Sequence, residues 1–158
     1  MLCHEGRPTI ALNPDRIGHT YPSYRYEVSR EKIREYAQAT GVHDPVYRAD
    51  PGAVALRDVV APPAFAACFC VGRTADVFAD PELGAHFNLV HGSQEFTLHR
   101  PVRGGDVYEC TPRIVDISDR GKMELLTYEI ACVDADTADP VVTSRSVIVF
   151  FKTDEESA

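Results

Sequence analysis

Hydrophobic residues between positions 29 and 41 recur at helical spacing. One face of this segment is formed by Ile33, Tyr36, Ala37 and Thr40, at i, i+3, i+4 and i+7, while the other face is charged. Ser29 suits the N-cap because its side chain can accept a hydrogen bond from an early backbone N–H, and Gly41 suits a left-handed stop. The pattern predicts an amphipathic helix between these two residues.

A second hydrophobic segment, residues 62–78, has no polar side over its central part. Pro62 and Pro63 open it and suit a first helical turn, and residues 64–72 are apolar on every side of a helix. A helix without a polar face must be enclosed, and in a chain of this length we expect a curved sheet to enclose it. The segment is shorter than the ~20 residues that span a bilayer, and it contains Arg73 and Asp76.

Four segments in the second half of the chain have strand character: residues 88–99, 106–118, 122–134 and 141–152. Arg120 and Gly121 are expected to form a hairpin, and connections this short require antiparallel pairing. Residues 21–28 form an edge strand or an extended lead-in, because Pro22 restricts pairing. The sequence therefore predicts an α+β domain in which a curved antiparallel sheet wraps a long central helix.

The connections and ends complete this prediction. Gly, Asp and Pro residues interrupt residues 41–50, which we expect to form a loop, and a short helix follows up to Arg57. The single domain is predicted at residues 18–153, between an N-terminal arm (1–17) and an acidic tail (154–158).

The charge of the chain narrows the classes of function. Among 158 residues, 16 are basic and 24 acidic, for a formal net charge of −8, and the basic residues are scattered. Nucleic-acid binding requires clustered Lys and Arg, so no nucleic-acid partner is expected. The chain begins without a basic region followed by an apolar run, so we expect neither secretion nor membrane association.

The five cysteines are odd in number and too sparse for a disulfide-stapled fold, which predicts free thiols and a cytoplasmic protein. Cys68 and Cys70 point in different directions on a helix and are expected to be separate buried thiols. The six histidines lack zinc-ligand spacing, and no phosphate-binding glycine loop is present, so we expect no metal and no cofactor.

Three stretches carry a family resemblance: YEVSREKIREYAQATG at 26–41, VVAPPAFA at 59–66 and VHGSQEFTLHRPVRGGDV at 90–107. As a set they are similar to the MaoC-like hot-dog dehydratases. More narrowly they resemble the FAS1-like N-terminal dehydratase branch, which includes the substrate-holding subunit of the mycobacterial (3R)-hydroxyacyl-ACP dehydratase. The resemblance covers residues 21–152 and implies a hot-dog fold. In this family the sheets of two hot-dog subunits join edge to edge, and their central helices face each other.

The resemblance also implies a catalytic Asp–His pair in a loop of the form G-D-x-N-P-x-H-x-D. Water addition or removal across the α,β bond of an acyl thioester needs a base for one proton and an acid for the hydroxyl. Here Val42 occupies the Asp position and Tyr47 the His position. Valine transfers no protons, and a tyrosine with a pKa near ~10 is a poor base at neutral pH. We expect no catalysis at these positions; His43 and Asp44 are the fallback acid and base, or else ordinary loop residues.

A second catalytic feature of the family is a glycine at the start of the central helix, whose N–H binds the thioester oxygen. Alignment places Pro63 at this glycine, after Pro62, and proline has no N–H.

The substrate contacts implied by the resemblance are Pro63, Phe65, Phe69, Val71 and His91. The helix residues would form the wall of a dry acyl tunnel or, equally, a plain core. His91 is a substrate contact or a structural residue. The most concentrated basic spot, His99, Arg100 and Arg103, would contact a carrier protein or is a solvated strand end.

Three functions are open on this basis. The first is the non-catalytic, acyl-chain-binding half of a heterodimeric (3R)-hydroxyacyl thioester dehydratase or enoyl hydratase, whose sister hot-dog subunit carries the Asp–His pair. The second is a self-sufficient homodimeric dehydratase or thioesterase with relocated residues, and the third is a non-enzymatic acyl-thioester-binding scaffold. The implied substrate is acyl-ACP or acyl-CoA, as in fatty acid or polyketide biosynthesis.

Overall fold

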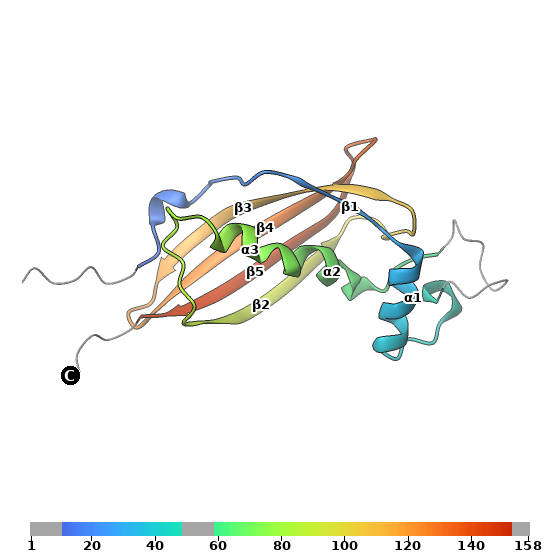
Figure 1. Ribbon diagram of the computed structural model, residues 1–158, viewed down its shortest axis with the longest axis horizontal. Coiled ribbons are helices and arrows are strands. Elements are labelled where there is room, and N and C mark those ends of the chain that lie inside the picture. Colours follow the sequence, from blue (N-terminus) through green and yellow to red (C-terminus); the bar gives the residue numbers. More distant parts are fainter. Residues whose placement is uncertain (1–10, 49–58, 153–158) are drawn as a thin grey trace, which may run out of the picture.

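The structure is a computed structural model that describes residues 11–48 and 59–152, in which one antiparallel sheet has the strand order β1-β3-β4-β5-β2 (Figure 1). The four strands predicted in the second half of the chain are confirmed to within one residue at each end. Residues 24–27 form a strand at one edge, as Pro22 indicated. The strands are β1 (Tyr24–Glu27), β2 (Leu89–Leu98), β3 (Val107–Asp119), β4 (Met123–Asp134) and β5 (Pro140–Phe151).

The first helix, α1 (Arg30–Ala39), forms where the amphipathic pattern predicted it. The Ser29 side chain accepts a hydrogen bond from the Lys32 N–H at 3.3 Å, and Gly41 follows the helix with a φ of 70°. Ile33 and Ala37 are fully buried. The helix therefore attaches to the domain through a narrow apolar stripe and leaves its charged side in solvent.

The central helix is one helical run from Pro63 to Phe78 that lies across one face of the sheet (Figure 1). Its helical type changes along its length. The Tyr24 hydroxyl donates a 2.6 Å hydrogen bond to the Phe69 carbonyl, next to the place where α2 gives way to a 3-10 turn. The run consists of a 3-10 turn (Pro63–Ala66), α2 (Ala67–Cys70), a second 3-10 turn (Val71–Arg73) and α3 (Thr74–Phe78). No helix in the described part of the chain is long and apolar enough to cross a membrane.

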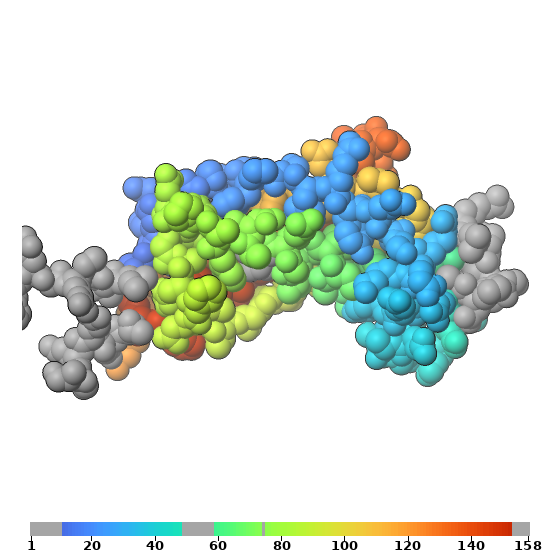
Figure 2. All heavy atoms as spheres, in the orientation of Figure 1, coloured from blue at the N-terminus to red at the C-terminus, as the bar shows by residue number. Residues whose placement is uncertain are grey.

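The predicted α+β arrangement of a long central helix and an antiparallel sheet is confirmed, and within the described residues the sheet covers one side of the helix. The buried side carries Phe65, Ala66, Phe69, Cys70 and Val77. The opposite side is open to solvent, where Figure 2 shows the green atoms of the helix at the surface. The exposed positions hold small residues, such as Ala64, Gly72 and Ala75, so an apolar helix can leave one side open at little cost in exposed apolar area.

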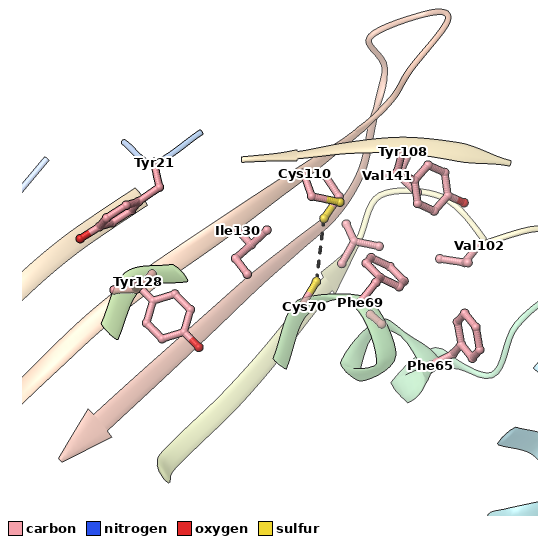
Figure 3. Close-up of a cluster of buried hydrophobic side chains, with 14 of the residues drawn as sticks. Tyr21, Phe65, Phe69, Cys70, Val102, Tyr108, Cys110, Tyr128, Ile130 and Val141 are labelled. Atoms are coloured by element: carbon pink, nitrogen blue, oxygen red, sulfur yellow. Dashed lines mark hydrogen bonds between the residues drawn. The ribbon is translucent and has the colours of Figure 1, made fainter. Parts of the chain in front are cut away.

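Aromatic side chains attach the helix to the sheet (Figure 3). The ring of Phe69 stacks on Tyr26 with centroids 4.8 Å apart and lies 5.9 Å from Tyr108, while Phe65 packs edge-on against Tyr36 at 5.5 Å. These rings fill the space between the helix, β1 and β3. The position of the helix is therefore set by bulky, fully buried groups.

Three buried thiols extend this core. Cys110 and Cys132 are direct partners across β3 and β4, and the Cys70 sulfur lies 3.8 Å from the Cys132 sulfur. Cys68, on the other side of the helix, is half-buried. The prediction of free thiols is confirmed for these four residues, and that of burial is confirmed for Cys70 but only partly for Cys68; Cys3 lies outside the described residues.

The predicted N-terminal arm is part of the packed domain from residue 11 onward. Leu12 is buried, and its N–H donates a 3.0 Å hydrogen bond to the Glu124 carboxylate. Arg16 forms a 2.6 Å ion pair with Asp80 after α3. The rest of the arm, the predicted short helix up to Arg57 and the acidic tail lie outside the described residues.

Replacing Gly84 with alanine should destabilise the domain more than the same change at Gly41. Both residues have positive φ, +75° and +70°, so both variants carry backbone strain of roughly 1 kcal/mol. At Gly84 the added Cβ would also lie 2.7 Å from the backbone oxygen of Ala11, whereas at Gly41 nothing lies within 4 Å. We expect Gly84→Ala to lose about 2–3 kcal/mol of unfolding free energy in urea denaturation. Equal losses in the two variants would contradict the tight contact between the N-terminal segment and the loop after α3.

Candidate functional site

A pocket of about 330 Å³ opens where the start of the central helix meets the end of β2. Segments far apart in the sequence surround it, and most of its lining is apolar. The polar side chains come from Tyr47, His99 and Arg100. The complete lining is Tyr47, Val60, Ala61, Pro62, Pro63, Leu98, His99, Arg100, Pro101 and Val102.

Backbone hydrogen bonds hold the two main walls of the pocket together. The Ala61 N–H donates to the Val102 carbonyl at 2.8 Å, and the Gly104 N–H donates to the Val59 carbonyl at 3.0 Å. Val60 and Arg103 form an isolated antiparallel bridge between the same segments. The start of the central helix is therefore fixed against the chain that leaves β2.

The loop after α1 supplies the third wall. The Asp44 carboxylate accepts a 3.0 Å hydrogen bond from the Val46 N–H and so caps a 3-10 turn, Pro45–Tyr47. This turn brings the half-buried Tyr47 to the pocket. Val42 is half-buried and lies outside the lining. The family's His position thus lines the pocket, as the resemblance implied, but with a phenol.

The fallback acid and base lie outside the pocket lining. His43 and Asp44 are both exposed, and Asp44 acts as the cap of the turn. At the helix start, Pro62 occupies the N-cap and Pro63 the first helical position. Neither residue has an N–H to donate to a thioester oxygen.

The Arg100 guanidinium, which we expected to contact a carrier, is held by two carboxylates of its own chain. It forms ion pairs with Asp106 at 2.7 Å and Asp134 at 2.6 Å and lies 5.6 Å from the centre of the Tyr108 ring. Burial disfavours its charge, but the hydrogen bond that it donates to Asp106 and the two negative charges raise the Arg100 pKa above its ordinary value. Arg100 thus lines the pocket as a cation whose charge is balanced by two carboxylates of its own chain.

The other two basic residues are more accessible. His99 is exposed, and its Nε2 lies 2.9 Å from the Thr143 hydroxyl. Arg103 is exposed beside the glycine turn that follows the pocket wall. Of the predicted basic spot, His99 and Arg103 are therefore the residues that face solvent near the pocket mouth.

The remaining predicted contacts are dispersed. Phe65 and Phe69 are fully buried in the core, and Val71 is half-buried on the central helix. His91 is exposed on β2, where its Nε2 lies 3.0 Å from the Ser93 carbonyl. Of the five predicted substrate contacts, the structure brings only Pro63 to the pocket.

Sequence reasoning missed the apolar half of the pocket wall, Leu98, Pro101 and Val102. These residues lie next to the basic residues singled out between 99 and 103, and their apolar character around a proline was the available signal. It also missed a polar cluster between β2 and β5, in which Gln94 donates to the Ser144 hydroxyl at 2.9 Å and accepts from the Ser146 hydroxyl at 2.6 Å. Across the described residues, no group of three His, Cys, Asp or Glu side chains is placed to hold a metal ion.

Removing the Asp134 carboxylate should destabilise the back of the pocket in a pH-dependent way. Two backbone N–H groups, from Asp136 and Thr137, and the Arg100 guanidinium hold the pKa of Asp134 below its ordinary value, against the effect of partial burial. Because the pKa of Asp134 is lower in the folded state than in the unfolded state, its carboxylate stabilises the fold fully above about pH 3.9. This stabilisation is lost as the pH falls through the folded-state pKa.

We expect Asp134→Asn to lower the unfolding free energy by roughly 1 kcal/mol at pH 7. The difference in unfolding free energy between the variant and the wild type should narrow below about pH 4. Urea denaturation, monitored by circular dichroism at pH 7 and at pH 3, measures the unfolding free energies of the variant and the wild type. The exposed Asp136→Asn change is the control and should have little effect. A difference of the same size at pH 7 and at pH 3 would contradict the role of the Asp134 charge.

The comparisons with known proteins agree with this architecture. A family model described as FAS1-like, dehydratase domain region, matches residues 15–144. The UPF0336 protein of Saccharopolyspora erythraea is 38% identical over 154 residues, which cover 93% of this chain and 96% of that protein.

Two solved structures have similar folds. A MaoC-like dehydratase is 26% identical with a TM-score of 0.75, over 88% of this chain and 43% of that chain. The truncated HadBC complex of Mycobacterium tuberculosis, described as a (3R)-hydroxyacyl-ACP dehydratase, is 24% identical with a TM-score of 0.69, over 85% and 97% of the chains. The fold is thus the hot-dog fold, and the chain belongs to the FAS1-like dehydratase family of MaoC-like proteins.

Proposed function

We propose that this chain is the non-catalytic, acyl-chain-binding subunit of a heterodimeric (3R)-hydroxyacyl thioester dehydratase, which also hydrates enoyl thioesters in the reverse direction. The pocket is the observation that supports this proposal. It has the place and the apolar walls of a thioester site, yet Tyr47 stands at the position of the proton-transferring His and Pro63 at the position of the N–H donor.

The chemistry of dehydration explains why this pocket needs a partner. One group must remove the proton α to the thioester while another protonates the departing β-hydroxyl. In this pocket the Arg100 guanidinium is bound by two carboxylates and the His99 ring is hydrogen-bonded to Thr143. The acid and the base are therefore assigned to a sister hot-dog subunit with an intact Asp–His loop.

The open side of the central helix is the proposed surface for the acyl chain. Its exposed residues include the small Ala64, Gly72 and Ala75 beside the charged Arg73 and Asp76. The small residues would leave a shallow path for an acyl chain once a second subunit covers them. Val71 and Cys68 are half-buried on the helix. Phe65 and Phe69 are assigned a supporting role on the other side of the helix, because their rings are fully buried and pack the helix onto the sheet.

Hydration of a trans-2-enoyl-CoA, measured as the loss of enoyl absorbance, tests whether binding and catalysis are divided between the two subunits. We expect background rates from the purified chain alone and from the sister alone, and turnover when the two are mixed. Replacing the Asp or His of the sister should abolish this activity. The double change His43→Ala and Asp44→Asn in this chain should leave it within about twofold of the wild type, because both residues lie outside the pocket.

Two results would contradict the proposal. Brisk turnover by this chain alone, lost in the His43→Ala variant, would establish a self-sufficient enzyme with relocated residues. Tight binding of the thioester without turnover in the presence of any dyad-bearing sister would establish a scaffold instead.

A second prediction concerns the carrier, ACP or CoA, which we assign to the solvent-facing basic residues near the pocket. Arg103→Glu should raise the KM for an acyl-ACP substrate roughly threefold to tenfold, the effect of losing about 1 kcal/mol of surface attraction. The KM for a short N-acetylcysteamine thioester, which has no acidic carrier, should not change. Arg120→Glu, an equally exposed change in the hairpin between β3 and β4, is the matched control. Equal effects on both substrates would argue against a carrier contact at Arg103.

A further inference from the structure

Phe87 has a solvent-exposed ring on a well-anchored backbone. Its side chain is 99% exposed. On one side, the His86 ring packs edge-on against Phe150 with centroids 5.2 Å apart. On the other side, the Phe151 N–H donates to the Asn88 carbonyl at 2.9 Å and the Asn88 side chain donates back to the Phe151 carbonyl at 3.0 Å. The ring therefore stands in water on a fixed support, and its burial against another molecule would be favourable.

The strand that follows Phe87 is a long free edge of the sheet. β2 has ten residues and pairs only with β5, whereas the opposite edge strand, β1, has four. Apolar side chains are exposed near both ends of β2, with Val90 at 48% and Leu98 at 39%. A long edge with unpaired N–H and C=O groups is a template for a strand of another chain.

Phe87 and the pocket lie at opposite ends of this strand. β2 runs from the end of the central helix near α3 to the end near its start (Figure 1). Ten strand residues separate the two places by roughly 33 Å within one chain, so the ring and the pocket of the same chain never meet.

Pairing of two such edges brings the two places together. A partner of the same fold, related by approximate two-fold symmetry, runs its edge strand antiparallel to β2. When the strands overlap along their full length, Leu89 lies opposite the partner residue equivalent to Leu98. Phe87 then lies opposite the residue equivalent to Arg100, which in this chain lines the pocket.

On the basis of the proposed function, we infer that Phe87 crosses the subunit interface and lies in the mouth of the thioester pocket of the dyad-bearing sister subunit. A dry cavity of roughly 150 Å³ holds one benzene ring. The equivalent pocket here measures about 330 Å³, so an entering ring leaves room for part of a substrate. This chain thereby contributes a wall of the active pocket in addition to its own acyl surface. Self-pairing would instead direct both rings into pockets that lack the acid and base.

Photo-crosslinking tests the position of the ring. p-Benzoylphenylalanine replaces Phe87 in the full chain, the sister is added, and mass spectrometry identifies the cross-linked peptide. We expect a cross-link to the sister segment equivalent to residues 98–102. The same photoreactive residue at Ile17, another exposed apolar position, should give no cross-link there.

Affinity and kinetics give a second measurement that does not depend on cross-linking. Phe87→Ala should weaken the complex roughly tenfold to a hundredfold, as for a buried aromatic anchor, and Phe87→Leu should weaken it less. At concentrations that saturate the complex, Phe87→Ala should still raise the KM for the enoyl thioester. Ile17→Ala should change neither quantity. A purely structural role of Phe87 would alter unfolding of the isolated chain but not the KM of the saturated complex.

The outcomes separate this inference from the proposed function. An active wild-type complex with no cross-link from position 87 to the sister, and with no effect of Phe87→Ala, overturns the inference and leaves the proposed function standing. A cross-linked complex that fails to hydrate the thioester supports the inference and contradicts the proposed function. A cross-link between two copies of this chain while the sister is present overturns the assignment of the sister as the partner.

Discussion

The packing of Phe65 and Phe69 between the central helix and the sheet is the contact on which the rest of the architecture depends. Both rings are buried among tyrosines from β1, β3 and α1, so they fix one side of the helix against the sheet. The aromatic bulk lies on this side, and the outward side carries small residues together with the charged Arg73 and Asp76. A helix packed in this asymmetric way is stable in a single chain and still presents an apolar surface to a second one.

The residues at the start of the central helix determine which hydrogen-bond donors the pocket has. Pro62 and Pro63 suit a first turn because their φ angles are set in advance and their missing N–H groups have no helical partner to lose. These prolines also remove the donors that a developing oxyanion would need. Next to them, Arg100 is neutralised by Asp106 and Asp134. Under the proposed function, this pocket binds substrate and the sister subunit supplies the acid and the base.

The sequence predicted the strands to within a residue because alternation and turn chemistry act locally. Ser29 and Gly41 likewise marked both ends of the first helix. The central helix and its sheet were also predicted, but the pattern did not indicate which side of the helix stays open, because periodicity counts apolar residues and does not weigh their size. Of the pocket lining, the sequence analysis named Tyr47 as a lost catalytic position, Pro63 as a substrate contact, and His99 and Arg100 as carrier contacts. It missed Leu98 and Val102. It also could not anticipate that Arg100 is bound by Asp134, since that ion pair joins positions 34 residues apart.

Separation of binding from catalysis follows from the symmetry of a paired hot-dog fold. Two related subunits produce two equivalent pockets, and a single pocket with an acid, a base and an N–H donor is enough for turnover. Under the proposed function, the second pocket is free to lose those groups, which would account for Val42, Tyr47 and Pro63 in this chain. What cannot be lost is the surface that completes the working pocket. In this chain the open side of the central helix, the free edge of β2 and the exposed Phe87 are available for that surface.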